Sequence, residues 1–544
     1  MRLTASFVRI TAIIAAVVWF SLLGYRDLAE PDEGRYAEIP REMVASGDWL
    51  TPRLNGFKYF EKPALQYWGT AVGYELFGLS NATARLWPAL IGFLGALWAG
   101  YVGLRLYGKT AGFYAALITV SSLLYVAMGH HLTLDMGVSV FLVIGIGSLA
   151  LAQQRREELA HVRRWMLIGW AALALATLSK GLIGLVLPAA TLVAYTLWQR
   201  DWALWRHLHL GKGLLLFLAI TVPWFVAVSL ANPEFAHFFF IHEHFERYTT
   251  NVHDRDEAIW YFIPIFILGV LPWLVVVLKS MFSPQFAWWP RAGEGFDAAR
   301  WLWLFAIVTF GFFSVGHSKL PSYILPMIPV VAVLAGRRLA REGMSRLDAG
   351  VLLLAVLLLL VAAAKAALLA DVPDLVQMYL DYRPWIVAAA ALLGLAAVAA
   401  FGAKLQPKRI AVVAGLALLS FQTLLWGFQS LSGYRSSHAI ADAIQANVPT
   451  GTEIYVVEIY YPQSLPVYLQ RTISLVGFKG ELEMGIEQEP QRWISSDAEF
   501  VQRWQREQQA VAVMDHAGFD KYRAQGLSMR LIYSDLERIV VVKQ

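Results

Sequence analysis

The sequence predicts an all-α polytopic membrane protein with about thirteen transmembrane helices and a C-terminal soluble α/β domain. Of the 544 residues, 58% are hydrophobic and only 16% are charged, which is typical of multi-spanning membrane proteins. Apolar runs long enough to cross about 30 Å of hydrocarbon recur as far as residue 429. Beyond residue 430 these runs cease, and shorter strand and helix patterns replace them.

We expect the first apolar run to be a retained span rather than a signal peptide, because no small-residue cleavage site follows Val8–Leu23. The thirteen expected spans cover residues 7–25, 84–107, 110–127, 132–152, 165–179, 181–199, 213–231, 259–280, 300–316, 320–340, 347–370, 384–403 and 409–429.

Basic residues in the loops indicate the orientation of the spans. They gather after spans 2, 4, 6, 10 and 12, at Arg105, Lys109, Arg155, Arg156, Arg163, Arg164, Arg200, Arg206, Lys212, Arg337, Arg338, Arg341, Arg346, Lys404, Lys408 and Arg409. By the positive-inside rule these even-numbered loops are cytoplasmic. An odd number of spans then places the loop 29–83 and the tail 430–544 outside.

The tail predicts a small α/β domain with alternating strand and helix patterns. Strands are expected at Thr452–Ile459, Arg471–Val476, Ala510–Met514, Arg530–Tyr533 and Arg538–Val542, and helices near Pro462–Leu469, Glu499–Glu507 and Phe519–Gln525. It contains no recognisable phosphate loop or catalytic triad, which favours a role as a lid or docking platform.

Several function classes are excluded or disfavoured by the sequence. The absence of Cys excludes disulfides, thiolate zinc sites and a Cys nucleophile. There is no Walker-type loop and no RNA-binding aromatic motif, so we expect no nucleic-acid partner. Few ionisable residues fall mid-span and no internal repeat is visible, which argues against a transporter.

The first loop holds an unusual concentration of charge for a chain of this composition. Ala29–Pro63 contains Asp32, Glu33, Arg35, Glu38, Arg41, Glu42, Lys58, Glu61 and Lys62. Ionisable groups beside lipid are costly unless they have a use. Further polar runs lie at the outer ends of other spans, in Gly129–Asp135, Ser179–Gly181, His237–Asp254 and Gly316–Tyr323. Their placement on one membrane face predicts a single cavity open to the outside.

The acidic pair Asp32-Glu33 in the first external loop resembles the signature of polytopic lipid-dependent glycosyltransferases of the GT-C class. The run DEGRYAEIPREMVASGDWLTPRLNGFKYFEKPALQYW is similar to the bacterial lipid A aminoarabinose transferases and their protein-mannosyltransferase-like relatives, as are HLTLDM, SKGLIGLVLP, HEHFERY and SKLPSYILP. The resemblance covers most of the first 340 residues. It implies that the transmembrane domain over 1–429 is a glycosyltransferase with a catalytic periplasmic loop at 26–83. The periplasmic domain over 430–544 follows from the span count alone, because the segment after span 11 and the tail carry no motif of the family.

The resemblance also implies the reaction and its partners. The donor would be undecaprenyl phosphate carrying 4-amino-4-deoxy-L-arabinose, the acceptor a lipid A phosphate, and the outcome inversion at the sugar and resistance to polymyxin. The site would face the periplasm from a bacterial inner membrane, among membrane lipids, in a monomer. The alternatives are a related glycosyltransferase acting on a protein or envelope glycan and, from another class, a lipid or solute transporter.

Residue types suggest roles in such a reaction. Asp32 would be the carboxylate near the anomeric carbon, acting as base for a hydroxyl acceptor or stabilising an oxocarbenium-like centre. Glu33 and Asp135 are further catalytic candidates, and Asp135 could instead bind a cationic amino-sugar. Cations and hydroxyls that could hold the donor phosphate are Arg35, Tyr59, Lys62, Lys180, Arg247, Lys319 and Tyr323.

Each role has a structural alternative. Asp32, Glu33 and Asp135 could cap helices, and Lys62, Lys180 and Lys319 could meet bulk lipid. Glu38, Arg41 and Glu42 are expected to be ordinary pairs on a helix surface. His130 and His131 are expected to be interfacial and not metal ligands. No cofactor is certain, but Glu61 with His242, beside His244, could hold Zn²⁺ or Mn²⁺.

Overall fold

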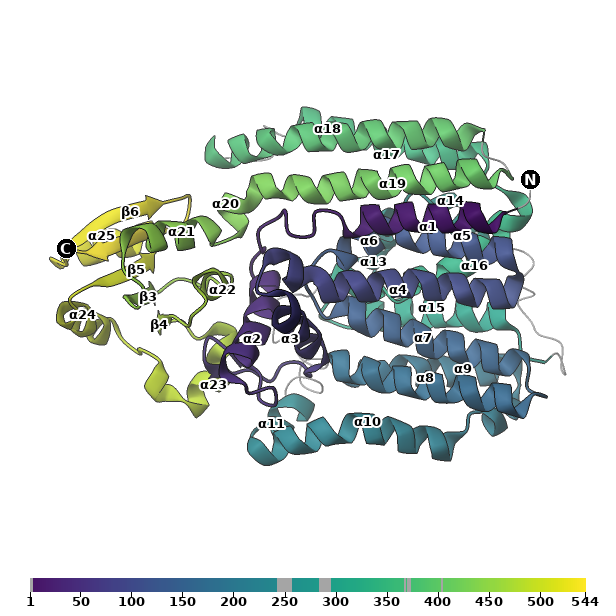
Figure 1. Cartoon of the computed structure of the whole chain (residues 1–544), viewed down its shortest axis with the longest axis horizontal. Helices are drawn as coiled ribbons and strands as arrows, with labels where there is room; N and C mark the ends of the chain where they lie inside the picture. The colour runs from purple at the N-terminus through teal and green to yellow at the C-terminus, as the bar shows by residue number, and fades with distance from the viewer. Residues whose placement is uncertain (1–2, 242–256, 283–294, 366–367, 369–372, 403–404) are drawn as a thin grey trace.

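A computed structural model describes residues 3–241, 257–282, 295–365, 368, 373–402 and 405–544. Most of the first 430 residues form a bundle of roughly parallel and antiparallel helices (Figure 1). These helices are α1 (Ala5–Phe20), α4 (Asn81–Tyr107), α5 (Lys109–Val120), α6 (Leu123–Gly129), α7 (Asp135–Gln154), α8 (Leu159–Lys180), α9 (Ile183–Gln199), α10 (Leu210–Ala231), α13 (Phe262–Gly269), α14 (Leu274–Met281), α15 (Ala298–Val315), α16 (Met327–Glu342), α17 (Arg346–Ala364), α18 (Pro373–Phe401) and α19 (Pro407–Gly427).

The length and composition of these helices are those of a multi-pass membrane protein. Within the described ranges, seven helices are long and apolar enough to cross a membrane, and up to nine spans result if each of two bent pairs counts as one. The pairs are α5 with α6, bent by 62°, and α13 with α14, bent by 119°. The helices α1 and α9 are apolar but shorter. The all-helical membrane domain is confirmed, while the count of thirteen spans stays a prediction.

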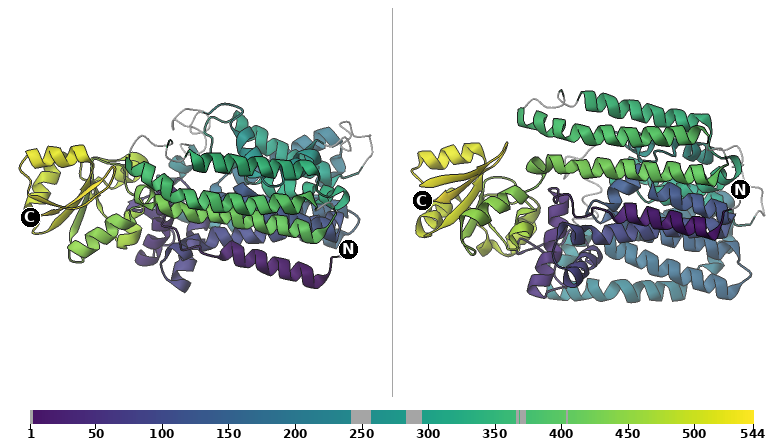
Figure 2. Two further views of the ribbon diagram at one scale, coloured as in Figure 1. Left: turned by 90° about the horizontal axis from the view of Figure 1, so that it is seen from above. Right: turned by 45° about the horizontal axis from the view of Figure 1, so that its top comes forward.

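The first loop and the tail together cover one end of the bundle. The loop contributes α2 (Asp32–Ser46), the strands β1 (Arg53–Leu54) and β2 (Phe57–Lys58), and α3 (Leu65–Phe77). Both views in Figure 2 place the tail beyond this loop and the N-terminus at the opposite end of the bundle. Asn55 and Gly56, both at positive φ, form the two-residue turn that joins β1 to β2.

The tail is an α/β domain, as the sequence predicts. Its sheet has the order β4-β3-β5-β7-β6, in which β4, β3 and β5 are parallel, while β7 pairs antiparallel with β5 and β6. The strands are β3 (Glu453–Val457), β4 (Ser474–Val476), β5 (Ala510–Met514), β6 (Met529–Ser534) and β7 (Ile539–Lys543), and the helices are α20 (Ser432–Arg435), α21 (His438–Asn447), α22 (Leu465–Leu469), α23 (Glu483–Gln488), α24 (Asp497–Arg506) and α25 (His516–Ala524). A helical run continues from Pro407 to Arg435, so the sheet domain starts with α21.

The first loop and the tail share one hydrophobic core. Ile39 and Phe57 of the loop pack in the same buried cluster as Ile440 and Leu465 of the tail. The backbones approach so closely that a Cβ on Gly34 would lie 2.5 Å from the backbone nitrogen of Ser464. Only glycine fits there. The loop is therefore fixed between the bundle and the tail.

This packing corrects one expectation from the sequence. Glu38, Arg41 and Glu42 are buried rather than solvated on a helix surface, because the tail covers α2. Arg41 donates two hydrogen bonds to Glu38, and the backbone N–H of Gly56 donates to Glu42. The i,i+3 pair exists, but it is part of the buried interface.

Candidate active site

Asp32 is the first residue of α2, where its carboxylate lies beside the positive end of the helix dipole. The side chain is partly exposed and makes no hydrogen bond or ion pair with any residue that the structure describes. It does not line the charged cavity described below. The Asp32 carboxylate is therefore accessible and forms no hydrogen bond or ion pair within the described structure.

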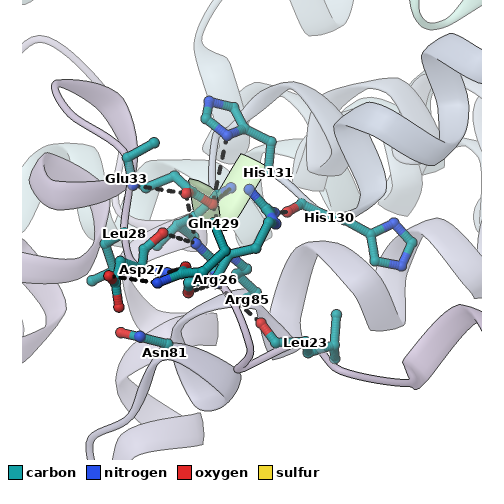
Figure 3. A network of polar contacts seen from close by, with 12 residues as sticks. Leu23, Arg26, Asp27, Leu28, Glu33, Asn81, Arg85, His130, His131 and Gln429 are labelled. Atoms are coloured by element: carbon teal, nitrogen blue, oxygen red, sulfur yellow. Dashed lines mark hydrogen bonds and ion pairs between the residues drawn. The ribbon is translucent and has the colours of Figure 1, made fainter. Parts of the chain in front are cut away.

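Glu33, one residue later, is fully buried and fixed by several donors (Figure 3). Its two carboxylate oxygens each accept a 2.7 Å hydrogen bond from Arg85 of α4. The backbone N–H of Leu132 also donates to Glu33, at 3.1 Å. Burial raises the pKa of Glu33, but Arg85 outweighs it and holds that pKa well below the ordinary value. The Glu33 carboxylate is thus paired within the protein and does not line the charged cavity described below, so its catalytic role stays a prediction.

Arg85 extends the same network to the chain that enters the first loop. Its guanidinium donates to the carbonyls of Leu23, Arg26 and Asp27 at 2.7–3.0 Å. Arg26 in turn donates to the carbonyl of His130 at 2.5 Å. His130 is buried, and its ring nitrogens lie 2.6–2.7 Å from the carbonyls of Trp19 and Val126. Its interfacial depth in the membrane stays a prediction. The end of α1 and the start of α2 are thus held in a fixed geometry.

A second cluster forms around Arg35, one turn after Asp32, and the tail contributes to it. Arg35 donates to Tyr59 at 3.1 Å and lies 4.0 Å from the carboxylate of Glu61. On its other side it donates to Gln463 at 2.9 Å and lies 3.6 Å from Glu481. Burial lowers the pKa of Arg35, but Tyr59 and the carboxylates of Glu61 and Glu481 outweigh it and raise that pKa. The guanidinium is thus a fixed positive charge held from two domains.

A cavity of about 480 Å³ lies next to this cluster, and we call it the charged cavity. Its ionisable and phenolic lining comes from four segments of the chain: Glu61, Lys62, Asp135, Lys180, His317 and Tyr323. The rest of the wall is mainly apolar and comes from α7, α9 and α15. An apolar chamber with a few convergent charges suits a ligand that is part lipid and part polar.

The charges in the cavity are arranged in pairs. Lys180 at the end of α8 forms an ion pair with Asp135 at the start of α7, and its ammonium lies 4.6 Å from the centre of the Tyr323 ring. The ammonium of Lys62 donates to the carbonyl of Glu61 at 2.8 Å and lies 3.9 Å from its carboxylate. Two cations and two carboxylates therefore meet in one chamber of low polarity, where electrostatic interactions are strong.

Not every predicted site residue reaches the cavity. Lys319 is buried, donates to the carbonyl of Glu257 at 2.5 Å and is absent from the lining. Arg247 and His242 lie outside the described residues, so their roles stay predictions. The described part of the chain contains no group of three or more His, Asp or Glu residues that could hold a metal.

Sequence reasoning missed several polar residues at the site. Ser139 and Ser318 line the cavity, and neither hydroxyl has a hydrogen-bond partner among the described residues. Ser139 follows Asp135 by one helical turn, a spacing that could have indicated it. Gln463 and Glu481 follow no motif, because only the folded tail brings them to Arg35.

Comparisons with known proteins agree with this architecture. Residues 4–239 match the family model for dolichyl-phosphate-mannose-protein mannosyltransferase, and residues 440–543 match that for the aminoarabinose transferase C-terminal domain. The crystal structure of ArnT from Cupriavidus metallidurans bound to undecaprenyl phosphate is 37% identical, with a TM-score of 0.91 over 99% of this chain and 98% of that chain.

Curated relatives match over a shorter length. An undecaprenyl phosphate-α-4-amino-4-deoxy-L-arabinose arabinosyl transferase of Erwinia tasmaniensis is 32% identical over 348 residues, which is 63% of this chain and 61% of the relative. A protein of the same name from Shewanella sediminis is 34% identical over 324 residues, 58% of this chain and 56% of the relative. The matched stretches thus span less than two thirds of these relatives.

The protein is a polytopic membrane protein with the GT-C glycosyltransferase fold. It combines the helical bundle, the charged cavity and the sheet domain that covers one end of the bundle. Within that class, the family is shown by the family model that matches the tail and by the similarity to ArnT over almost the full length of both chains. The chain belongs to the aminoarabinose transferase family.

Proposed function

We propose that this protein transfers 4-amino-4-deoxy-L-arabinose from undecaprenyl phosphate to a phosphate of lipid A. The observation that carries the proposal is the charged cavity, an apolar chamber whose wall presents Lys62 and Lys180 next to Glu61 and Asp135. The related ArnT of C. metallidurans was crystallised with undecaprenyl phosphate, and its name and fold support the same donor here. The site would face the periplasm from the bacterial inner membrane, in a monomer.

The chemistry follows from the nature of the two phosphates. An oxygen of the lipid A phosphate forms a bond to the anomeric carbon, while the bond from that carbon to the undecaprenyl phosphate oxygen breaks. The bonding electrons leave with undecaprenyl phosphate, so negative charge develops on that phosphate. Lys62 is suited to stabilise it in an apolar chamber, where such interactions are strong. The acceptor is already anionic and needs no general base.

The carboxylates would then act on the sugar. Asp32 would stabilise positive charge that develops at the anomeric carbon, since its own carboxylate makes no structural contact with the described residues. Asp135 would bind the amino group of the sugar and exchange its Lys180 partner for it when the donor enters. Lys180 would then be released toward the donor phosphate. Lys319 would contact the donor only if it left the Glu257 carbonyl.

A divalent metal remains a separate proposal. Glu61 offers a carboxylate at the cavity wall, and Zn²⁺ or Mn²⁺ would take it together with imidazole ligands. Metal analysis of the purified protein before and after chelation tests this point. If transfer were unchanged after complete removal of metal, no metal would be needed, and Glu61 would serve as an ion-pair partner of Arg35 and Lys62.

The test is a transfer reaction with purified protein, aminoarabinose-linked undecaprenyl phosphate and lipid A. We expect the mass of lipid A to increase by one aminopentose residue, and cells lacking the gene to become more sensitive to polymyxin. Addition of a cationic sugar reduces the negative charge that attracts cationic peptides. Labelling of a protein acceptor but not lipid A would contradict the proposal, as would movement of the donor without transfer.

A further inference from the structure

A second groove lies between α1, α4 and α5, and we call it the α1 groove. Its volume is about 610 Å³, and it shares no lining residue with the charged cavity. It runs along α1 from Leu3 to Ala15, and Figures 1 and 2 place the start of α1 at the end of the bundle opposite the tail. The α1 groove is therefore distinct from the proposed reaction site.

The groove is open because small residues line its sides. Ala12 and Ala15 of α1 and Ala96 and Gly100 of α4 are among its lining residues. Phe93 of α4 and Phe113 of α5 also line the groove, and their ring centres lie 5.5 Å from Phe20 and 5.8 Å from Phe7 of α1, respectively. The groove is thus an apolar-walled slot between three helices, and such a wall suits a hydrocarbon chain.

Two cations lie at the N-terminal end of this slot. Arg9 and Lys109 both line it, are exposed, and form no hydrogen bond or ion pair with another residue in the described ranges. Arg105 stands nearby and donates to the hydroxyl of Tyr101, which also lines the groove. Guanidinium and ammonium groups beside a hydroxyl are a typical phosphate-binding set.

The positions of these cations also indicate the leaflet. Arg105 lies in the last turn of α4 and Lys109 begins α5, and basic residues at such a connection face the cytoplasm by the positive-inside rule. The cytoplasmic surface of a membrane carries anionic lipids, which attract lysine and arginine there. Charge complementarity therefore favours an anionic lipid over a neutral one, and the groove supplies the apolar slot that its chain needs.

We propose that the α1 groove binds one anionic glycerophospholipid of the cytoplasmic leaflet. One acyl chain lies in the slot between α1 and α4, and the phosphate contacts Arg9 and Lys109. The proposal is independent of the transfer reaction, because the donor phosphate is assigned to the charged cavity at the other end of the bundle. It predicts a lipid that stays bound when bulk lipid is removed.

Native mass spectrometry of the delipidated full-length protein tests the proposal directly. The protein is titrated with phosphatidylglycerol or with phosphatidylcholine of the same acyl chains. We expect one phosphatidylglycerol to remain bound at collision energies that remove phosphatidylcholine. The double variant Arg9→Gln/Lys109→Gln should lose this preference and retain the two lipids equally.

A matched control is provided by Arg163 and Lys212, two exposed cations near His209 that do not line the groove. Arg163→Gln/Lys212→Gln removes the same charge and should keep the preference for phosphatidylglycerol. A second measurement, the shift in melting temperature on adding each lipid, should follow the same pattern. Equal retention of both lipids by the unaltered protein would overturn the proposal, as would equal losses in the two double variants.

Discussion

At the scale of single residues, adjacent acidic positions have different environments. Asp32 and Glu33 are neighbours in the sequence, and both could be catalytic on residue type alone. Glu33 is buried with Arg85, whereas Asp32 makes no such contact with the described residues. The sequence motif therefore marks the segment but cannot separate a buried, paired carboxylate from a partly exposed one. That distinction depends on Arg85, 52 residues away along the chain.

Replacing Glu33 should reduce stability in a pH-dependent way. Glu33→Gln leaves Arg85 buried without its counter-charge, which costs about 3 kcal/mol in a buried pair. The native pKa of Glu33 is held below its ordinary 4.5, so the pair stabilises the fold fully above that pH. This stability is lost as the pH falls through the native pKa. Melting temperatures of the two proteins should thus differ at pH 7 and converge in acid.

The exposed Glu75 of α3 offers a matched control in the same loop. Glu75→Gln changes the same chemical group and should leave the melting temperature unaltered at both pH values. If Glu33→Gln proved as stable as Glu75→Gln at pH 7, the buried pair would not hold the loop as described.

At the scale of elements, the tail reaches the proposed site through two short segments. Gln463 precedes α22 and Glu481 precedes α23, and both contact Arg35 of α2. The bundle helices and the tail strands could be predicted because apolar length and alternation are local patterns. The burial of Glu38, Arg41 and Glu42 could not, since the covering elements follow some 400 residues later.

Removing a contact between Arg35 and the tail should lower the rate of transfer more than it weakens substrate binding. Gln463→Ala removes the 2.9 Å contact to Arg35, and misplacement of a charged group near a reacting centre reduces the rate roughly tenfold or more. We expect kcat to fall while KM for the donor changes little. Gln488→Ala, at an exposed position of α23, is the control and should behave as the unaltered protein. Equal effects of both substitutions would indicate a general disturbance of the tail instead.

At the scale of the whole molecule, the first loop joins the bundle to the tail. Arg53 forms a bidentate pair with Glu489 at 2.8–3.2 Å, and the Asn55 side chain exchanges two hydrogen bonds with the backbone of Ile473. A shared core lies beneath them. The two domains are therefore expected to move together, and the site to depend on both.

Reversing the charge at this junction tests the coupling. The partly exposed bidentate pair between Arg53 and Glu489 contributes about 1 kcal/mol to the stability of this junction. Arg53→Glu replaces the pair with two like charges, so the tail should become more sensitive to limited proteolysis. Adding Glu489→Arg should restore part of the protection. If the tail of Arg53→Glu resisted proteolysis as well as that of the unaltered protein, the shared core alone would hold the domains together.

In the proposed reaction, the charged cavity and the neighbouring carboxylate Asp32 carry out sugar transfer from undecaprenyl phosphate. The most direct measurement is the initial rate of aminopentose transfer to lipid A by Lys62→Gln and Asp32→Asn. Lys58→Gln is the matched control, because Lys58 lies in the same loop but pairs with Glu234 at 2.6 Å and does not line the cavity. We expect both site variants to lose about 100-fold or more in rate and the control to keep most of it. Full rates in both Lys62→Gln and Asp32→Asn would show that neither side chain takes part in sugar transfer.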